Sequence, residues 1–186
     1  MMKGNLVELR PVTAEDMERL FLWRNDEEVA MLAAGSSVVA YSNISLDSLR
    51  AMYEETVRTA KLHDKMNRFI FSVYTHDGVH IGTCDYRDVN PITRAATIGI
   101  GILAKEYWSK GYGTDTLHAL LRFLFLKLNL NRVQLDTWSG NVRAIRAYEK
   151  CGFILEGRLR QNEYVDGTYY DTIMMGVLRE DYLRAK

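Results

Sequence analysis

One segment decides the fold of this chain: Asn141-Val142-Arg143-Ala144-Ile145-Arg146-Ala147-Tyr148-Glu149-Lys150-Cys151-Gly152-Phe153. Asn is a favoured N-cap residue and Gly a favoured C-terminal stop, so the segment predicts a helix between Asn141 and Gly152. The helical period brings a small residue among larger ones onto one face, where another group can approach the backbone. That face carries Asn141, Ala144, Ile145 and Tyr148.

The two polar residues of that face have structural explanations as well as functional ones. Asn141 is sufficiently explained as a helix cap. A lone buried tyrosine such as Tyr148 is commonly a core residue whose hydroxyl finds a hydrogen-bond partner. The helix segment alone therefore leaves a functional role open, and a second segment is needed to decide.

That second segment is Lys110-Gly111-Tyr112-Gly113-Thr114, which opens a helix with leucines at helical spacing. It follows a glycine-interrupted strand, Ala96 to Leu103, whose glycines suggest a bulge or a close approach to the backbone. Free amides at a helix N-terminus, with glycines that leave room, form a cradle for an anion. The loop matches neither the Walker pattern nor the dinucleotide fingerprint. A plain strand-to-helix turn is the alternative.

The rest of the chain predicts an α/β (α+β) fold with a mixed, mostly antiparallel central sheet flanked by helices. Alternating or apolar runs predict strands, and the pairs Asp77-Gly78 and Asp166-Gly167 predict hairpin turns. We expect one helix capped by Thr13 and a second beginning near Ser45. The apolar residues of the second helix are Leu46, Leu49, Met52, Tyr53, Val57 and Ala60. Residues 26–44 read as irregular because of Gly35-Ser36-Ser37. The strands are expected at 5–10, 69–73, 79–89, 96–103, 133–137, 153–164 and 168–177.

Composition bounds the class of protein. The chain has 186 residues, 47% of them hydrophobic, with 24 Lys+Arg balanced by 24 Asp+Glu. We therefore expect one domain over 1–186, with no net charge to attract nucleic acid or an anionic membrane. Unpaired Cys84 and Cys151, and the lack of a signal peptide or membrane span, favour a cytoplasmic protein. No metal site is expected from the spacing of His63, His76, His80 and His118.

Together, the two segments resemble the signatures of the GNAT superfamily of acyl-CoA N-acyltransferases. The pattern N-x-x-A-I-x-x-Y-E-K-x-G-F is long and specific, and the element order is similar along nearly the whole chain. Trp108 and the ending, Glu156 to Met175 through Asp166-Gly167, resemble one branch of that superfamily. This branch contains ribosomal-protein N-terminal acetyltransferases and spermidine acetyltransferases.

The resemblance implies acetyl-CoA as cosubstrate. Its pyrophosphate would bind the amides of the 110–114 loop, and its pantetheine arm would add to the strand from Ile100 to Leu103. Asn141 would contact that arm, and Tyr148 would lie near the sulfur. The cofactor-binding residues implied in this way are Ile100, Ile102, Leu103, Trp108, Lys110, Gly111, Tyr112, Gly113, Thr114, Asn141, Ala144 and Tyr148.

The implied chemistry is direct attack of an amine on the thioester. A strand amide near Ile100 would stabilise the oxyanion, and Tyr148 would be the catalytic residue that gives the thiolate a proton. The sequence departs from its relatives at Thr97, where many members of the branch carry Glu. A threonine is no base at neutral pH, so the base would be a water chain, another carboxylate, or no dedicated group. The carboxylates considered are Asp85, Asp88, Glu163 and Asp171.

The acceptor is less readable from the sequence. We expect a primary amine, either a protein N-terminus or a small amine such as a polyamine. The alternatives are an aminoglycoside or nucleotide amino sugar, or a non-catalytic acyl-CoA-binding regulatory module. The first two helices and the last hairpin would wall the acceptor site, and the basic residues of 143–150 read mainly as a solvated face. A homodimer is expected only by analogy. The aromatic candidates are Trp23, Tyr164, Tyr169 and Tyr170.

Overall fold

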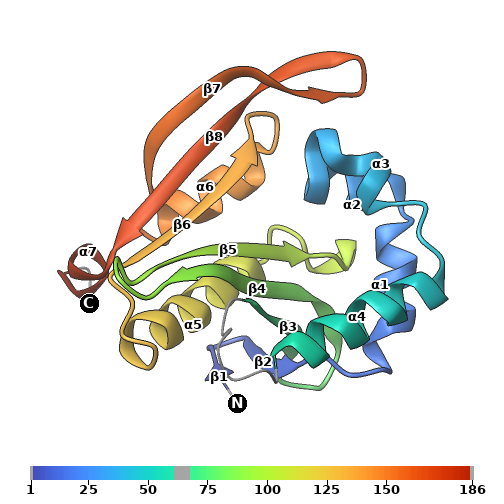
Figure 1. Cartoon of the computed structure of the whole chain (residues 1–186), viewed down its shortest axis with the longest axis horizontal. Coiled ribbons are helices and arrows are strands. Elements are labelled where there is room, and N and C mark those ends of the chain that lie inside the picture. The colour runs from blue at the N-terminus through green and yellow to red at the C-terminus, as the bar shows by residue number, and fades with distance from the viewer. Residues whose placement is uncertain (1, 61–67, 185–186) are drawn as a thin grey trace.

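A single mixed sheet organises the computed structural model, which describes residues 2–60 and 68–184, with side chains omitted for 56–60. Its eight strands run in the order β1-β2-β3-β4-β5-β6-β8-β7 (Figure 1). All neighbouring strands are antiparallel except β5 and β6, which confirms the predicted mostly antiparallel sheet. The strands are β1 (Met2–Lys3), β2 (Val7–Pro11), β3 (Arg68–Thr75), β4 (His80–Asn90), β5 (Ala95–Ile102), β6 (Arg132–Trp138), β7 (Ile154–Val165) and β8 (Thr168–Leu178).

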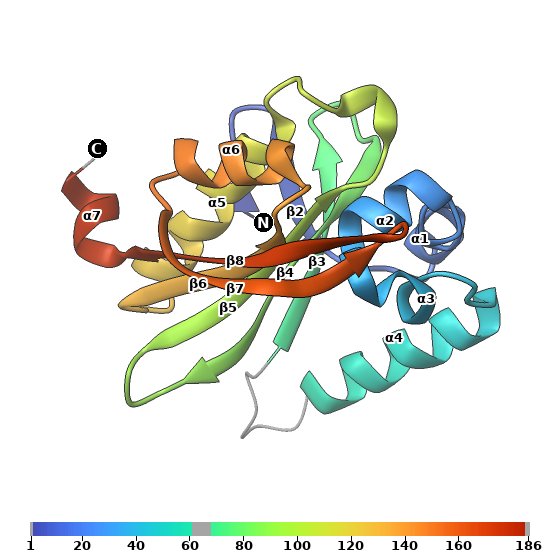
Figure 2. The ribbon, with the colours of Figure 1, turned by 90° about the horizontal axis from the view of Figure 1, so that it is seen from above.

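The helices divide into two groups around this sheet. The predicted signature helix is α6, and it follows α5 on one side of the sheet, whereas α1 to α4 gather at the other end (Figure 2). The helices are α1 (Asp16–Arg24), α2 (Glu27–Ala34), α3 (Val38–Tyr41), α4 (Leu46–Ala60), α5 (Tyr112–Leu126), α6 (Val142–Lys150) and α7 (Arg179–Arg184), with short 3-10 turns η1 (Gly35–Ser37) and η2 (Lys105–Tyr107).

The parallel pair at the centre of the sheet separates soon after it forms. Register between β5 and β6 is recorded only from Ala95–Arg132 to Thr97–Gln134. Both strands continue beyond this point, β5 still paired to β4 and β6 still paired to β8. Figure 1 shows β5 and β6 spreading apart there. From Ile98 onward, the edge of β5 that faces β6 therefore has no strand partner among the described residues.

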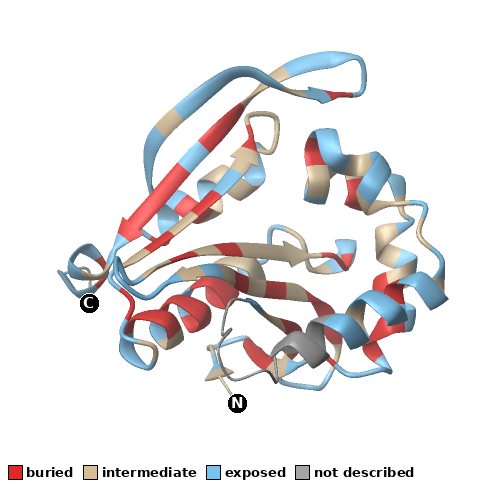
Figure 3. Cartoon of the chain, viewed as in Figure 1, coloured by how far each residue is buried: buried red, intermediate tan, exposed pale blue. Residues whose placement is uncertain are grey.

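Two apolar cores hold the elements together. The larger one joins α5 to the sheet, and the inner face of that helix is buried (Figure 3). Of the leucines predicted at helical spacing, Leu117, Leu120, Leu121 and Leu124 are fully buried, whereas Leu128 lies beyond the end of α5 and is half-buried. The smaller core lies among α1, α2, α4 and the end of β5, and includes Met17, Val29, Leu49 and Leu103. Burial of a Leu or Met side chain contributes about 1.5–3 kcal/mol, so the larger core dominates the stability of the fold.

The N-terminal segment is fixed to the larger core by one carboxylate. Asp115, in the first turn of α5, accepts backbone hydrogen bonds from Asn5, Leu6 and Val7 at 2.9, 2.7 and 3.1 Å. A Cβ at Gly4 would lie 2.2 Å from this carboxylate. Asp115 therefore joins β2 to the start of α5.

The prediction of irregular structure for residues 26–44 is wrong. Asp26 caps α2 by accepting the Val29 amide at 3.0 Å, and the residues that follow it are good helix formers. Gly35-Ser36-Ser37 forms a 3-10 turn between α2 and α3 instead of a loop. The Gly-Ser-Ser run marks the end of α2, and its loop-like composition led to the wrong prediction for both α2 and α3.

Smaller differences also have local causes. Thr13 does not cap α1, because Asp16 accepts the Thr13 amide at 2.8 Å and the N-cap residue is Glu15. The recorded irregularity between β4 and β5 falls at Arg87/Asn90, away from the glycines of β5. Strand β1 and helix α7 were not predicted. Val57 and Ala60, two of the apolar residues expected on the second helix, lie outside the described side chains.

In the described part of the chain, no helix is by itself long and apolar enough to cross a membrane; one pair bent by 98°, over 27–41 and 46–55, passes on length and composition alone.

Candidate functional site

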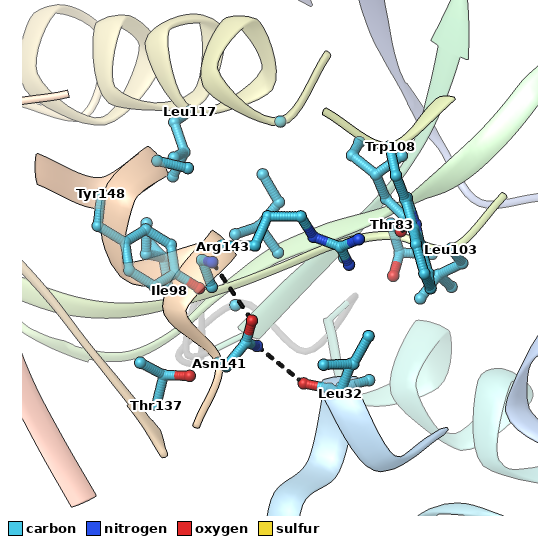
Figure 4. A pocket seen from close by; sticks show the side chains of 18 of the residues that line it. Leu32, Thr83, Ile98, Leu103, Trp108, Leu117, Thr137, Asn141, Arg143 and Tyr148 are labelled. Carbon is cyan, nitrogen blue, oxygen red and sulfur yellow. Dashed lines mark hydrogen bonds between the residues drawn. The ribbon is translucent and has the colours of Figure 1, made fainter. Parts of the chain in front are cut away.

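The gap between β5 and β6 opens into a cleft of about 760 Å³. The N-terminus of α5, the inner face of α6, the C-terminal end of α2 and one residue of β7 complete its walls. Figure 4 shows Tyr148, Asn141 and Arg143 pointing into this space from α6, with Trp108 on the opposite side. Segments far apart in the sequence thus meet around the separated strands.

One end of the cleft has the geometry of an anion site. Gly111 caps α5 with a φ of +89°, a conformation that favours glycine. The first recorded bond of the helix runs from the Asp115 amide to the Gly111 carbonyl at 3.0 Å. The amides before it, at positions 112–114, stand at the positive end of the helix without a partner within it. The loop therefore keeps the donors that a phosphate group needs.

The unpaired edge of β5 borders this anion site. Ile100 and Ile102 line the cleft, and no strand of the described chain pairs with this edge. The Trp108 indole donates to the Ile102 carbonyl at 2.6 Å, so that one acceptor is already used. The remaining edge leaves backbone groups for an extended ligand to bond in the manner of an added strand.

Tyr148 is the buried phenol of the cleft. Only 7% of the residue is exposed, and its hydroxyl makes no hydrogen bond within the described residues. Burial, together with the nearby negative charge of Asp136, raises the pKa of Tyr148 to about 12. The phenol therefore carries its proton at neutral pH and faces the cleft with that proton uncommitted.

Asn141 makes two contacts that fix the cleft walls. Its Oδ1 accepts the Ala144 amide at 3.3 Å, which confirms the predicted N-cap. Its Nδ2 donates to the Leu32 carbonyl at 3.0 Å, as the dashed lines of Figure 4 show. The side chain thus ties the start of α6 to the end of α2 across the cleft.

The structure brings together most of the residues expected to hold the cofactor. Lys110 is exposed and does not line the cleft. Tyr112 does not line it either, because its ring packs edge-on against Tyr107 at 5.1 Å. Only their backbone groups remain available for the expected role. The expected residues that do line the cleft are Ile100, Ile102, Leu103, Trp108, Gly111, Gly113, Thr114, Asn141, Ala144 and Tyr148.

Three basic residues of α6 also line the cleft, although the sequence suggested a mainly solvated face. They are Arg143, Arg146 and Lys150. The Arg143 guanidinium stacks 3.8 Å from the centre of the Trp108 ring. Their spacing of three and four residues was the available signal, because it puts all three on one side of the helix. They add positive charge beside the α5 N-terminus.

The opposite end of the cleft carries carboxylates. Asp85 and Glu163, two of the four proposed bases, line it, and Asp136, which the sequence reasoning missed, lines it too. Asp88 and Asp171 do not line the cleft, and Asp171 instead pairs with Arg158 at 3.1 Å. The alternation of β6 could have revealed Asp136, since Val133 and Leu135 face the core.

The aromatic wall of this end differs from the expected one. Trp138 and Tyr41 line the cleft, together with residues of α2. The expected aromatics lie elsewhere: Trp23 packs on His80 at 5.0 Å, and Tyr164 packs on Tyr169 at 4.9 Å. Tyr170 packs behind Trp138 at 4.9 Å.

Thr97 lies where β5 and β6 are still paired. Its hydroxyl accepts a long hydrogen bond of 3.4 Å from the Gln134 amide, and it is absent from the cleft lining. Within the described ranges, no group of three or more His, Cys, Asp or Glu could hold a metal ion. His63 lies outside those ranges.

Comparison with protein families identifies the domain. Residues 7–154 match the model described as "Acetyltransferase (GNAT) domain". The chain is 32% identical over 139 residues to a spermidine N(1)-acetyltransferase of Vibrio cholerae, covering 75% of this chain and 76% of that protein. It is 29% identical over 189 residues to the spermidine N(1)-acetyltransferase of Escherichia coli K12, covering 98% and 91%.

Other relatives extend this picture. A putative ribosomal N-acetyltransferase of Bacillus subtilis is 32% identical over 107 residues, which covers 58% of each protein. The crystal structure of a Vibrio cholerae spermidine N-acetyltransferase in complex with CoA and spermine superposes with a TM-score of 0.83 at 27% identity, covering 97% of this chain and 99% of that one.

Proposed function

Since this chain belongs to the GNAT acetyltransferase family and uses acetyl-CoA, we propose that it acetylates a primary amine of a polyamine such as spermidine. The observation that carries the proposal is the separation of charge along the cleft. Basic side chains and a helix N-terminus lie at one end. Three carboxylates against one arginine lie at the other. An anionic donor and a cationic acceptor suit these two ends.

The donor end suits coenzyme A in its chemistry. In this proposal the amides of the 110–114 loop hold the pyrophosphate, and Arg143, Arg146 and Lys150 neutralise phosphate charge. The free edge of β5, from Ile100 to Leu103, holds the pantetheine arm as an added strand. Trp108 lies against Arg143 at 3.8 Å, which supports a fixed position for that guanidinium.

The reaction needs two contributions from the protein, a hydrogen-bond donor for the oxyanion and a proton donor for the leaving sulfur. Acetyl-CoA supplies an activated acetyl thioester when it is bound. A strand amide near Ile100 donates to the developing oxyanion, and Tyr148 gives a proton to the departing sulfur. The raised pKa of Tyr148, about 12, supports this role, because a phenol that keeps its proton at neutral pH can act as an acid.

The acceptor end suits a flexible polycation. Asp85, Asp136 and Glu163 supply negative charge, and Trp138 and Tyr41 supply aromatic surface for an alkylammonium chain. Two relatives are named spermidine N(1)-acetyltransferases, and the similar crystal structure holds spermine. A basic acceptor end would have supported a nucleotide amino sugar. The relatives also give no support to a non-catalytic module.

A protein N-terminus is the second candidate acceptor. One relative is named a putative ribosomal N-acetyltransferase, although the alignment covers only 58% of each chain. Gly35 of η1 and Glu163 of β7 line the cleft, and a chain end with a terminal ammonium could meet the Glu163 carboxylate there. The charge of the acceptor end favours the polyamine.

We also propose the setting in which the enzyme works. Residues 1–186 form one acetyltransferase domain, a proposal that the continuous sheet supports. Free, buried Cys84 and Cys151 suit the reducing cytoplasm. A homodimer is supported by the exposed apolar side chains of the edge strand β7, Ile154, Leu155 and Leu159. Light scattering of the purified chain measures that state.

The experiment that tests the acceptor is thiol release from acetyl-CoA. The purified chain is incubated with acetyl-CoA and, separately, spermidine, peptides of varied N-termini, aminoglycosides and nucleotide amino sugars. We expect release with spermidine, and slower or no release with the other pools. Release with peptides alone would transfer the proposal to a protein N-terminus. No release from any pool, with acetyl-CoA binding confirmed by calorimetry, would overturn the proposed activity.

A further inference from the structure

We infer that Asp136 on β6 is the base that removes the proton from the acceptor amine, in place of the glutamate that its relatives often carry on β5. The inference rests on the proposed amine acetylation. It is argued from the three carboxylates that line the cleft, each of which has different partners.

Asp85 already forms an ion pair with a neighbouring arginine. Its Oδ1 accepts a hydrogen bond from the Arg87 guanidinium at 2.9 Å, and both residues line the cleft. The arginine occupies one oxygen of this carboxylate and balances its negative charge. Asp85 therefore serves better as a fixed negative charge than as a base.

Glu163 is committed to holding two elements together. Its carboxylate accepts the Ser36 amide at 3.2 Å, the Ser36 hydroxyl, and the Thr172 hydroxyl at 2.8 Å. Burial acts against these bonds, but they prevail and lower the pKa of Glu163. With these oxygens occupied, Glu163 fastens η1 to β7 and β8 and has little capacity left for an incoming proton.

Asp136 has no such partner. Within the described residues it makes no hydrogen bond or ion pair, and it is exposed to the cleft. The negative charge of Asp136 nevertheless acts on Tyr148, because it contributes to the raised pKa of that phenol. Of the three cleft carboxylates, this is the one whose oxygens remain available.

The strand register places Asp136 across the gap from Asp85. Gly99 pairs with Asp85, and a Cβ built on Gly99 would lie 2.5 Å from the Asp85 carboxylate. The register between β5 and β6 ends at Thr97 and Gln134, and Gly99 and Asp136 each follow two residues later, where the strands part. Gly99 adds no side chain between the two carboxylates, and an amine entering there meets one on each side.

Tyr148 lies on the other side of this gap. It packs in the larger core with Ile98 and Leu135, which alternate with Gly99 and Asp136 along their strands. A proton acceptor on the open face and a proton donor on the helix face therefore flank the point where β5 and β6 part. The other charged residues that line the cleft in the described part of the chain are the Asp85–Arg87 pair, Glu163, and Arg143, Arg146 and Lys150 of α6.

The proton balance of the reaction is then complete. The acceptor arrives as an ammonium, so Asp136 first takes one proton and passes it to solvent, which frees the nitrogen lone pair. As the bond from the nitrogen to the acetyl carbon forms, the nitrogen loses its second proton to the Asp136 carboxylate, and as the bond from carbon to sulfur breaks, the sulfur takes the proton of Tyr148. Proton exchange with solvent restores both groups, so the net products are the acetamide, the free thiol and one proton.

The test compares Asp136→Asn with Asp88→Asn, whose carboxylate lies outside the cleft. We expect kcat with spermidine to fall about tenfold or more in Asp136→Asn, with the smallest deficit at high pH, where more of the amine is already neutral. The deficit should shrink for acceptor amines of low pKa, because these arrive without the extra proton. Affinity for CoA, measured by calorimetry, and the melting temperature should match those of the wild-type chain.

Two further variants make the result decisive. Asp136→Glu should recover much of the rate, and Asp136→Ala should be rescued by added formate. A kcat within twofold of wild type in Asp136→Asn would overturn the assignment, as would a deficit of equal size for amines of every pKa. If the wild-type chain acetylates none of the amines, the proposed function fails first, whereas failure of the base alone leaves wild-type turnover intact.

Discussion

The two ends of the cleft are built in different ways. The donor end is made of backbone and of one helix face, from the loop at 110–114, the free edge of β5 and α6. The acceptor end is made of single side chains from α2, β4, β6 and β7. Asn141 joins the ends by bonding α6 to Leu32. The donor end thus comes from a few short segments that each carry several contacts, whereas the acceptor end comes from single residues dispersed along the chain.

This difference predicts separable variants. Changes at the donor end should weaken CoA binding and leave the acceptor KM alone, and changes at the acceptor end should do the opposite. Tyr148 lies between the ends and should affect turnover with little effect on either affinity. A variant at either end that changes both CoA affinity and the acceptor KM would contradict the independence of the two ends.

The largest effect is expected at the boundary. Tyr148→Phe removes the proton that the buried phenol carries, so kcat should fall about tenfold or more, as for a lost general acid. Affinity for acetyl-CoA, measured by calorimetry, should change little. Tyr164→Phe on the exposed hairpin is the matched control. Unchanged turnover in Tyr148→Phe would remove this residue from the acid role.

At the donor end, Gly113→Val should weaken acetyl-CoA binding about tenfold, because its side chain would intrude on the helix N-terminus that suits phosphate. A Cβ at this position meets only Ile102 at 3.7 Å, so the fold should tolerate it. Gly111→Val also weakens binding in our account, but its φ of +89° adds strain. Normal affinity in Gly113→Val would contradict the placement of the pyrophosphate.

At the acceptor end, Glu163→Ala should raise the KM for spermidine several-fold, since it removes both a negative charge and the link to Ser36. Glu163→Gln removes the charge and can keep hydrogen bonds to Ser36, so it separates the two contributions. Steady-state kinetics and CoA calorimetry make the comparison. Weaker CoA binding in either variant would show that the ends are not independent.

The smallest direct effect on binding is expected from Arg143→Ala. Loss of one partly exposed cation beside Trp108 should weaken CoA binding about three- to tenfold, with a weaker dependence on salt. Arg160→Ala, outside the cleft, is the control. An equal loss of CoA affinity in the two variants would show that Arg143 has no specific role in CoA binding.

A difference in stability should accompany the difference in function. Beside the smaller core, buried Asp16 of α1 lies 3.3 Å from buried His80 of β4, whose ring packs on Trp23. Burial opposes ionisation of Asp16, but bonds from Tyr74, Thr13 and Ser72 prevail and lower its pKa, whereas burial lowers the pKa of His80.

Both shifts have the same sign for stability. An unfolded histidine binds a proton near pH 6.5 and an unfolded aspartate near pH 3.8. In the folded chain, both pKa values are lower, so His80 and Asp16 bind their protons only at lower pH. The stabilisation that comes from these two groups is therefore complete above about pH 6.5. It declines as the pH falls below 6.5, through protonation of His80, and further below 3.8, through protonation of Asp16. Hydrogen exchange should show α1 and α2 opening before α5 in acid. Simultaneous opening of all helices would contradict a separate, acid-sensitive core.

The sequence predicted the donor end better than the acceptor end for a physical reason. Helix caps, glycines at a helix start and the Tyr148 face are local features, and a local segment is enough to specify them. Asp85, Asp136 and Glu163 meet only because of sheet register and the separation of β5 from β6, which no segment encodes alone. The helix α2 was missed because a Gly-Ser-Ser run outweighed its capping Asp26.

The most direct test of the two-ended cleft is an NMR titration of backbone amides with CoA and, separately, with spermidine. We predict that CoA perturbs the amides of 100–103 and 110–114, and that spermidine perturbs those around Asp85, Asp136 and Glu163, with little overlap. A CoA titration that leaves 110–114 unperturbed, or a spermidine titration that perturbs the same amides as CoA, would contradict the account.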